Sequence, residues 1–519
     1  LQRGPNSPGL DNPGRRALLV GSAGAMASVS LLGFTPLARA QSAMTLPDYA
    51  AWKDQSALIV HSANTMETRR DAIGSGVLTP SDRLFVRNNL PPPPADVTDQ
   101  PDTWAVRIDG VKNPKTLTVA ELKSLGVVTV ASVLQCSGNG RAFFPHGASG
   151  TQWSVGAAGC VMWTGVPLKT VVEALGGPMA GATYITSTGG ETLPDGLDPK
   201  TVVVERSVPT RALEHALLAW GLNDEPLPRA HGGPLRLVVP GYYGVNNVKY
   251  VKRVAFTEQQ TDAKIQASGY RIRPIGEKGQ QNQPSMWRMP VKSWLNGPGA
   301  DGAPVLAGLN TLYGVAFSGE RGVEAVEVSA DDGATWQQAE WVGPDLGPNA
   351  WRTFQFAANL PVGEHRFVTR ATDTQGDQQP KLAVHNHRGY GHNGWQDHGL
   401  SIRAVAELPR NEIKASLQAS DSSAETVSAS MPVLALSDKA LEGKQLFLQR
   451  AQPGCGVCHS LADADARGVV GPNLNQLSPS LAQVESAIAQ GVGAMPAYGA
   501  QLSQKEIAAL AAYVVEATR

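Results

Sequence analysis

The residues with the most specific chemistry lie near the end of the chain, in QPGCGVCHSL (452–461). Cys455, Cys458 and His459 form C-x-x-C-H, the attachment pattern of a c-type haem. In such a site two thiols add to the haem vinyl groups and the histidine ligates the iron. Met495, in GVGAMPAYG, offers a soft thioether and is expected to be the second iron ligand. A redox dithiol or half of a zinc site is the alternative, although the chain has no second C-x-x-C.

The other two cysteines lie far upstream. Cys136, in VASVLQCSGNGRAFF, follows an apolar run and precedes a glycine-rich turn and Arg141. A thiolate needs a nearby positive charge or a metal to stay ionised near neutral pH, and Arg141 could supply that charge. By its type alone Cys136 could equally be a buried core thiol, and Cys160, in GAAGCVMW, is interpreted as one.

The composition limits the class of protein that could contain these sites. A length of 519 residues predicts several domains, about three at ~150 residues each. The formal charge of −1 gives no support for nucleic acid or an anionic membrane as a partner. Four cysteines are too few for a disulfide framework.

The first 40 residues have the pattern of an export signal. Arg15 and Arg16 precede an uncharged apolar run, Ala17 to Ala38, which ends in an A-x-A cleavage site at 38–40. The alternative is an uncleaved membrane anchor, since ~20 apolar residues can span a bilayer. A twin-arginine signal predicts a periplasmic protein that carries a cofactor inserted before export. Haem c is attached after export, so a second cofactor is expected.

The rest of the chain divides by pattern. After the signal we expect a mixed α+β domain, in which Thr118 and Glu121 form the capping box of a short helix. Short alternating strands with turns every 8–12 residues then favour an immunoglobulin-like β-sandwich. A Ser/Ala-rich linker follows, and the last segment is mainly helical. The expected boundaries are 1–40, 41–282, 283–408, 409–433 and 434–519.

Four motifs in order make the middle of the chain similar to a known family. LFVRNNLP, QCSGNGR, HGGPLRLVVPGYYGVNNVKYVKRV and HNHRGYGHNGW resemble those of the sulfite oxidase family of molybdenum enzymes, over roughly 80–405. The C-terminal segment resembles a class I cytochrome c. The resemblance implies an α+β molybdopterin domain of the sulfite-oxidase type, followed by the β-sandwich as a dimerisation domain and by an all-α cytochrome domain.

The resemblance also implies roles for particular residues. Cys136 matches the thiolate ligand of molybdenum, which is otherwise held by the dithiolene of molybdopterin. Arginines near the substrate oxyanion are matched by Arg87, Arg141 and Arg388, and Tyr270 matches an active-site tyrosine. Planar, permanently charged guanidinium groups suit a small oxyanion such as sulfite. The remaining matches are contacts to the cofactor, at Asn88, Asn89, His231, Arg236, Asn247 and Lys249.

Two departures from the family pattern bear on the substrate. Sulfite-oxidising members usually carry a histidine two residues after the first arginine, where this chain has Asn89. The sequence CSGNGR is more similar to the sulfane dehydrogenase branch.

The run VHNHRGYGHNGWQDH contains four histidines, His385, His387, His392 and His398. They could bind a metal, but they are interpreted as active-site lining and structural residues.

These observations predict a periplasmic molybdenum enzyme fused to its own electron acceptor. The first hypothesis is a homodimeric sulfite dehydrogenase that passes electrons through haem c to an external cytochrome. It would have no nucleic-acid partner, and no membrane association after signal cleavage. The second keeps the cofactors but changes the substrate, to a bound sulfane or an S-oxide. The third is an electron carrier on an inactive scaffold, which retention of Cys136 and three matched arginines disfavours.

Overall fold

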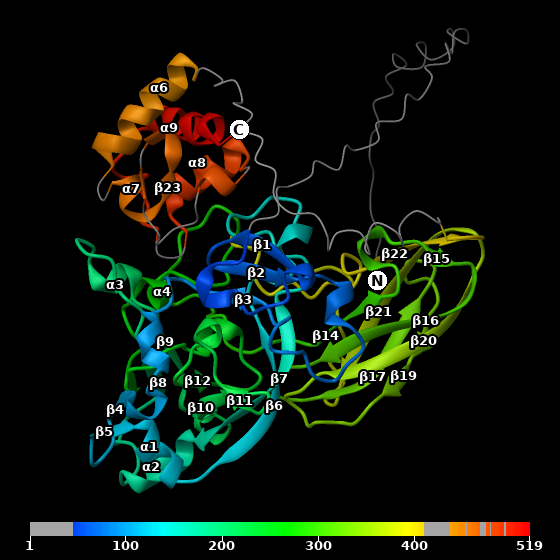
Figure 1. The fold of residues 1–519 in the computed structure, drawn as a ribbon, viewed down its shortest axis with the longest axis horizontal. Helices are drawn as coiled ribbons and strands as arrows, with labels where there is room; N and C mark the ends of the chain where they lie inside the picture. Colours follow the sequence, from blue (N-terminus) through cyan, green and yellow to red (C-terminus); the bar gives the residue numbers. More distant parts are fainter. Residues whose placement is uncertain are drawn as a thin grey trace, which may run out of the picture. The chain divides into compact units, whose positions relative to one another are not determined.

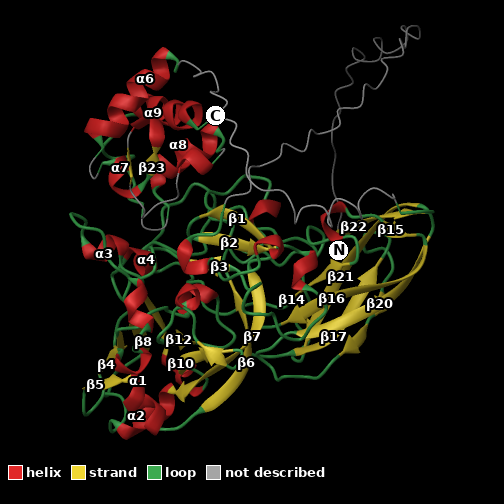
Figure 2. Ribbon diagram, viewed as in Figure 1, coloured by secondary structure: helices red, strands yellow, loops and turns green. Residues whose placement is uncertain are grey.

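The computed structural model describes residues 45–408 and 436–518, with gaps at 452–453, 465, 468–473, 478 and 493–494. The expected export signal, and the linker expected at 409–433, therefore lie outside the described residues. The domain boundaries expected from sequence stay predictions. Figure 1 shows a sheet-rich middle of the chain and a helical C-terminal part, and Figure 2 separates the two by secondary structure.

The first part of the fold contains three sheets. A small sheet has the order β1-β2-β3, and two five-stranded sheets follow. One has the order β11-β10-β7-β6, with β12 also paired to β10, and the other β5-β4-β13-β8-β9. In the small sheet the strands are β1 (Leu58–Ser62), β2 (Thr65–Thr68) and β3 (Val86–Arg87). In the second they are β6 (Val128–Gln135), β7 (Ala158–Pro167), β10 (Leu217–Leu222), β11 (Glu225–Pro226) and β12 (Arg236–Val238). In the third they are β4 (Ala105–Asp109), β5 (Lys115–Thr118), β8 (Tyr184–Thr188), β9 (Glu205–Pro209) and β13 (Arg253–Thr257).

Short helices connect these strands. They are α1 (Val119–Ser124), α2 (Leu168–Ala174), α3 (Pro199–Val202) and α4 (Lys264–Ala267). The capping box expected from sequence begins α1: the Thr118 hydroxyl accepts from the Glu121 backbone amide, and the Glu121 carboxylate accepts from the Thr118 amide. Each bond satisfies a backbone donor that a helix end leaves free.

A second region consists of two further sheets, ordered β14-β16-β20-β19 and β15-β22-β21-β17-β18. One apolar core cluster contains buried residues of both, among them Leu295, Phe354 and Ile402. Two packed sheets agree with the expected sandwich, while its immunoglobulin-like topology stays a prediction. The strands are β14 (Lys292–Gly297), β15 (Val305–Leu306), β16 (Gly308–Phe317), β17 (Val323–Ser329), β18 (Gln337–Gln338), β19 (Glu340–Val342), β20 (Arg352–Leu360), β21 (Gly363–Asp373) and β22 (Leu400–Val405).

The loop between β16 and β17 joins the two regions. Gly319 has a φ of +47°, and a Cβ there would lie 2.5 Å from the Met289 carbonyl oxygen. A Cβ on Gly241 would likewise lie 2.9 Å from the Gly319 carbonyl carbon. The next residue, Glu320, forms an ion pair with Arg288. Two glycines therefore let the backbones of the two regions approach closely.

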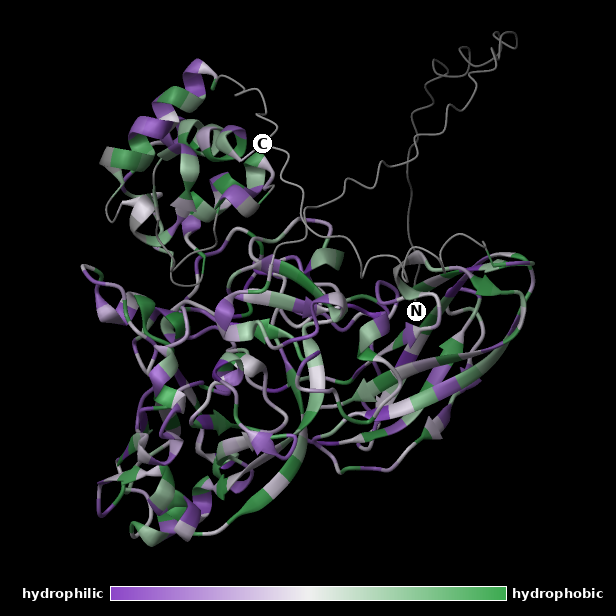
Figure 3. Ribbon diagram, viewed as in Figure 1, coloured by the Kyte–Doolittle hydropathy of each residue, from purple (hydrophilic) through white to green (hydrophobic). Residues whose placement is uncertain are grey.

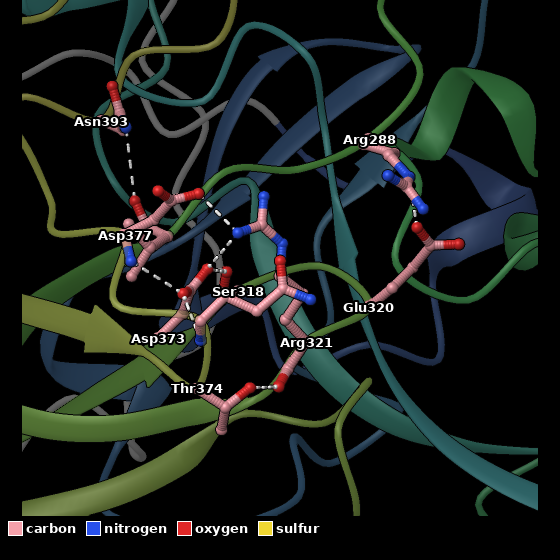
Figure 4. A network of polar contacts seen from close by, with 10 residues as sticks. Arg288, Ser318, Glu320, Arg321, Asp373, Thr374, Asp377 and Asn393 are labelled. Carbon is pink, nitrogen blue, oxygen red and sulfur yellow. Dashed lines mark hydrogen bonds and ion pairs between the residues drawn. The ribbon is translucent and has the colours of Figure 1, made fainter.

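The same loop is tied to the end of β21 by a polar network (Figure 4). The Asp373 carboxylate is buried and accepts from the Ser318 hydroxyl at 2.8 Å. It also accepts from the Asp377 backbone amide at 3.0 Å and pairs with Arg321 at 3.1 Å. Asp377, whose side chain is mostly exposed, pairs with the same guanidinium. One buried carboxylate therefore organises the turn after β21.

The C-terminal region is helical. Its main helices are α6 (Asp438–Gln445), α8 (Leu481–Gln490) and α9 (Gln504–Ala517), and Figure 3 shows hydrophilic and hydrophobic residues mixed along them. The buried side of α9 carries Leu510, Tyr513 and Val514. The smaller elements are the π-helical turn Leu446–Arg450, α7 (Cys455–Cys458), β23 (Ser460–Leu461) and β24 (Ala466–Arg467). Among the residues described, no helix is long and apolar enough to cross a membrane.

Candidate functional site

A pocket opens beside Cys136, the residue that follows β6. The Cys136 amide donates to the Ala157 carbonyl at 2.9 Å, which fixes the end of the strand. The Asn139 amide then donates back to the Cys136 carbonyl at 3.0 Å and closes a tight turn. The thiol is thereby held at the end of a rigid strand. The pocket is lined by Phe85, Arg87, Asn88, Asn89, Leu134, Cys136, Ser137, Glu191, Val204, His231, Arg236, Gly244, Val245, Asn247, Val248, Lys249 and Tyr270.

Gly138, in CSGNGR, and Gly150, further along the chain, leave room for Arg141. A Cβ on Gly138 would lie 2.6 Å from the central carbon of the Arg141 guanidinium, and one on Gly150 would lie 3.2 Å from it. The guanidinium donates to two backbone carbonyls, those of Arg388 at 2.9 Å and Thr151 at 2.7 Å. No carboxylate pairs with it among the described residues, and burial lowers its pKa from the ordinary value. Arg141 is thus a buried cation suited to an anionic neighbour.

Arg87 and Tyr270 meet at Asn89. The Asn89 side-chain oxygen accepts from the Arg87 guanidinium at 2.9 Å and lies 3.3 Å from the Tyr270 hydroxyl. Burial raises the pKa of Tyr270, while the nearby Arg87 lowers it. All three side chains line the pocket that contains Cys136. An anion in this pocket would therefore face a guanidinium, a carboxamide and a neutral phenol.

Tyr270 belongs to a stack of two rings with guanidinium groups on both sides. Its ring lies on that of Tyr390, with centroids 5.1 Å apart and planes 9° apart. The Arg206 guanidinium lies 5.6 Å from the Tyr270 ring, and those of Arg141 and Arg388 lie 5.3 and 5.8 Å from the Tyr390 ring. Tyr270 also has a φ of +50°, an uncommon backbone conformation for a bulky residue. The stack, together with the hydrogen bond to Asn89, holds its side chain in place.

A second group of cations lines another part of the pocket. Lys249 donates to the Asn88 side-chain oxygen at 2.5 Å and to the Ala230 carbonyl at 2.6 Å. Arg236 donates to the carbonyls of Asn247 and His231, at 3.0 and 2.8 Å. All four acceptors are neutral. Burial lowers the pKa of Arg236 to about 9, and burial together with neighbouring cations moves those of Lys249 and His231 well below their usual values.

The candidate haem residues lie at the start of the helical region. Cys455 and Cys458 begin and end the single turn α7, and His459 follows directly. Both thiols are buried and free, and burial raises the pKa of Cys455 to about 11. Met495 packs against the apolar core of this region, which also contains Cys455. The turn α7 and the residue after it thus present two thiols and an imidazole within five residues.

Three family models match the chain. An oxidoreductase molybdopterin binding domain matches residues 91–265, a Mo-co oxidoreductase dimerisation domain matches 283–403, and the model described as "Cytochrome C oxidase, cbb3-type, subunit III" matches 438–514. Chicken sulfite oxidase is 31% identical over 350 residues, covering 63% of this chain and 74% of its own. The chain belongs to the sulfite oxidase family.

Other relatives of this sulfite oxidase family member agree. The mitochondrial sulfite oxidase of mouse is 31% identical over 356 residues, which is 64% of this chain and 63% of the mouse protein. The match therefore spans less than two thirds of the mouse enzyme. The solved structure of the sulfane dehydrogenase SoxCD from Paracoccus pantotrophus shares the fold, with a TM-score of 0.55 and 24% identity. It covers 66% of this chain and 86% of that one.

The pocket fits the molybdopterin cofactor of this family. Three buried polar atoms on its wall have no hydrogen-bond partner among the described residues: Nδ2 of Asn88, Oγ of Ser137 and Nε2 of His231. The cations beside them have only neutral acceptors, as a site for a phosphate requires. The Cys136 thiol faces the same space and is the available sulfur ligand. The helical region fits haem c in the same way, since its two free thiols have the attachment spacing.

Two titratable residues, Glu191 in the pocket and Lys53 outside its lining, were not found from the sequence. Glu191 lines the pocket, and burial raises the pKa of its carboxyl to about 7. Lys53 donates to the carbonyls of Ser81 and Leu84, and burial lowers its pKa to about 7. Their motifs carry no signal, because both reach their partners only through tertiary folding. Arg141 and Arg388, by contrast, were expected at the substrate but do not line the pocket, and they contact the Tyr390 ring instead.

The histidine run forms separate contacts. The His387 ring accepts from the Gly276 amide at 3.0 Å, and His392 lies 3.1 Å from the Asp397 carboxylate. The rings of His392 and His398 lie edge to face, 4.9 Å apart. Within the described residues, no three His, Cys, Asp or Glu side chains come together as a metal site.

Proposed function

We propose that this chain is a molybdenum-dependent sulfite dehydrogenase. The observation that carries the proposal is the arrangement of Arg87, Asn89 and Tyr270 around the pocket of the Cys136 thiol. In the reaction, sulfite and water give sulfate, two protons and two electrons. When bound, molybdenum supplies oxygen-atom transfer and two-electron redox chemistry.

The chain's own residues bind and orient the substrate. Arg87 would pair with a sulfite oxygen, and the buried Arg141 would add positive potential behind it. The phenol of Tyr270 stays neutral at working pH, because burial raises its pKa, and so can donate a hydrogen bond. Cys136 would hold the metal, while Lys249, Arg236, His231, Asn88 and Asn247 would bind the pterin and its phosphate.

The C-terminal region would serve as the internal electron acceptor. Cys455 and Cys458 would carry the haem, and His459 and Met495 would hold its iron. A His/Met haem has a raised potential, which suits the removal of electrons from sulfite oxidation. Electrons would leave for an external cytochrome c. A periplasmic location and a homodimer built through residues 283–403 complete the proposal; the dimer is supported by the match to a dimerisation domain.

One observation favours a second candidate. Asn89 stands where sulfite-oxidising members of the family usually have a histidine, so the pocket lacks a titrating donor at that position. Another sulfur substrate, such as a sulfane or an S-oxide, would then replace sulfite while the cofactors stay the same.

Stopped-flow spectroscopy tests the proposal directly. Air-oxidised holoprotein is mixed with sulfite, and haem reduction is followed at the α-band. We expect fast reduction in the wild type and in Cys160→Ala, whose thiol is buried in the core, and none in Cys136→Ser. Absence of reduction in a wild-type sample with one molybdenum per chain would exclude sulfite, and the same assay with a sulfane would then test the second candidate.

A further inference from the structure

The side-chain amide of Asn89 can be oriented from its neighbours alone. A guanidinium is only a donor, so the atom of Asn89 that lies 2.9 Å from Arg87 must be the oxygen. The Tyr270 hydroxyl, 3.3 Å from that oxygen, is also a donor to it. The oxygen is thus occupied by two groups that both line the pocket. The NH2 group must then point to the opposite side of the amide.

That NH2 group has no hydrogen-bond partner in the described part of the chain. Asn89 is only half-buried and lines the pocket, and its Nδ2 is not among the buried unpartnered atoms. Its two N–H bonds are therefore accessible, on a residue that lines the space beside Arg87 where an anion would lie. Asn88, the preceding residue, has its oxygen on Lys249 and a free Nδ2 in the same way. Two successive amides thus each turn the oxygen to a cation and the NH2 away from it.

We propose that Asn89 is both a positioning residue and a substrate donor: its Oδ1 holds Arg87 and the Tyr270 hydroxyl together, and its Nδ2 donates to an oxygen of the bound sulfur oxyanion. The inference rests on the proposed function, because it assigns that oxyanion to this pocket. It deepens the proposal by naming a donor that does not titrate. A carboxamide stays neutral across the working pH range, so residue 89 adds no pH dependence to oxyanion binding.

The test separates the two roles with three variants of the molybdenum-loaded, haem-containing enzyme. Asn89→Asp keeps an oxygen for Arg87 and Tyr270 but replaces the donor by a second acceptor. We expect it to raise the KM for sulfite and the dissociation constant of sulfate, measured by calorimetry, at least tenfold, with a smaller effect on kcat. Asn89→His restores a donor that titrates, so its KM is expected to vary with pH near the histidine pKa of about 6.5. Asn89→Ala loses both roles and should lower kcat as well.

A double-mutant cycle isolates positioning. If Asn89 holds Tyr270, the effects of Asn89→Ala and Tyr270→Phe on kcat/KM will be non-additive, since each removes the same hydrogen bond. Asn113→Asp, an exposed change of the same kind outside the pocket lining, is the matched control and should leave every value unchanged. Molybdenum and haem content, measured for each variant, exclude a folding defect.

The outcomes distinguish this inference from the proposed function. If the wild type oxidises sulfite but Asn89→Asp binds sulfite and sulfate normally, the donor role is wrong. Additive effects in the cycle would overturn the positioning role. If the wild type does not oxidise sulfite but Asn89→Asp still weakens sulfate binding tenfold, the proposed reaction fails and the assignment of Asn89 as an oxyanion donor stands.

Discussion

The rings of Tyr270 and Tyr390 lie face to face with their centroids 5.1 Å apart, although 120 residues separate them in the chain. Arg206 lies against the outer face of one ring and Arg141 against the other ring. Aromatic stacking and desolvated cation–π contacts each contribute on the order of 1–2 kcal/mol. The stacked pair therefore sets the position of Tyr270 at the pocket and of Arg141 behind the pocket.

Tyr390→Leu should distinguish the contribution of the ring contacts from that of filling the same space with apolar atoms. Leucine fills part of the space but removes both the ring contact and the cation–π partner of Arg141. We expect kcat/KM for sulfite to fall about tenfold to a hundredfold, in line with ~1.4–2.7 kcal/mol. Tyr390→Phe keeps the ring and should stay within about threefold of wild type. Equal losses in the two variants would assign the effect to the hydroxyl instead.

Gly138→Ala should displace Arg141 without altering any charge. The added methyl would lie 2.6 Å from the guanidinium carbon, so the side chain must leave its position. We expect kcat/KM for sulfite to fall about a hundredfold, as is typical when a charge-stabilising donor is misplaced. Gly76→Ala, in an exposed segment with a single contact at 3.3 Å, is the control. Unchanged turnover in Gly138→Ala would show that the exact position of Arg141 does not matter.

Lys292 on β14 should lower the stability of the protein near neutral pH. Its amine is buried without a hydrogen-bond partner among the described residues, 5.4 Å from the Trp294 ring, and burial lowers its pKa to about 7. An unfolded lysine titrates near 10.4, so between about pH 7 and 10.4 the unfolded state binds one more proton. The free energy of unfolding therefore rises with pH in that window. Below about pH 7 the full cost of burying the charged amine is present.

Lys292→Met removes that cost. We expect the variant to be more stable at pH 7, by up to about 4 kcal/mol, with the gain shrinking as the pH approaches about 10. Scanning calorimetry at several pH values measures it. Lys278→Met, at an exposed position, should change the midpoint little at any pH. A lower midpoint for Lys292→Met at pH 7 would mean that the amine has a stabilising partner.

Asp373→Ala should weaken the β-sandwich region. The variant leaves the Ser318 hydroxyl, the Asp377 amide and the Arg321 guanidinium without their shared acceptor. Loss of a buried carboxylate that accepts several hydrogen bonds costs about 2–4 kcal/mol. Asp377→Ala removes only an exposed partner of Arg321 and should cost below about 1 kcal/mol. Thermal unfolding of the two variants side by side checks the difference, and equal costs would contradict it.

The sequence was enough to predict those features that depend only on residues close together in the chain. The capping box at Thr118 and Glu121, and the thiol spacing of α7, are set within four residues. The motif residues Arg87, Cys136 and Tyr270 could also be named from the sequence, and the structure brings them to one pocket.

The rest depends on contacts between distant segments. Nothing near Arg206 in the sequence indicates that β9 would place its guanidinium against Tyr270, or that Asn246 would accept from it at 3.1 Å. The same is true of Tyr390, because its stacking partner comes from a different part of the chain. The glycines of CSGNGR could be seen in the sequence. The sequence did not show that the Arg141 guanidinium occupies the space beside Gly138.

The close approach of Gly241 and Gly319 limits how this protein can be rebuilt from parts. Gly241 directly precedes Tyr242 and Tyr243, and the pocket-lining Gly244 and Val245 follow, so the contact holds the cofactor wall to the sandwich. A chimaera that takes its β-sandwich from another protein would need a residue without a Cβ at both positions. The sandwich is therefore not an interchangeable module, and its exchange would disturb the cofactor pocket before it changed any interface between subunits.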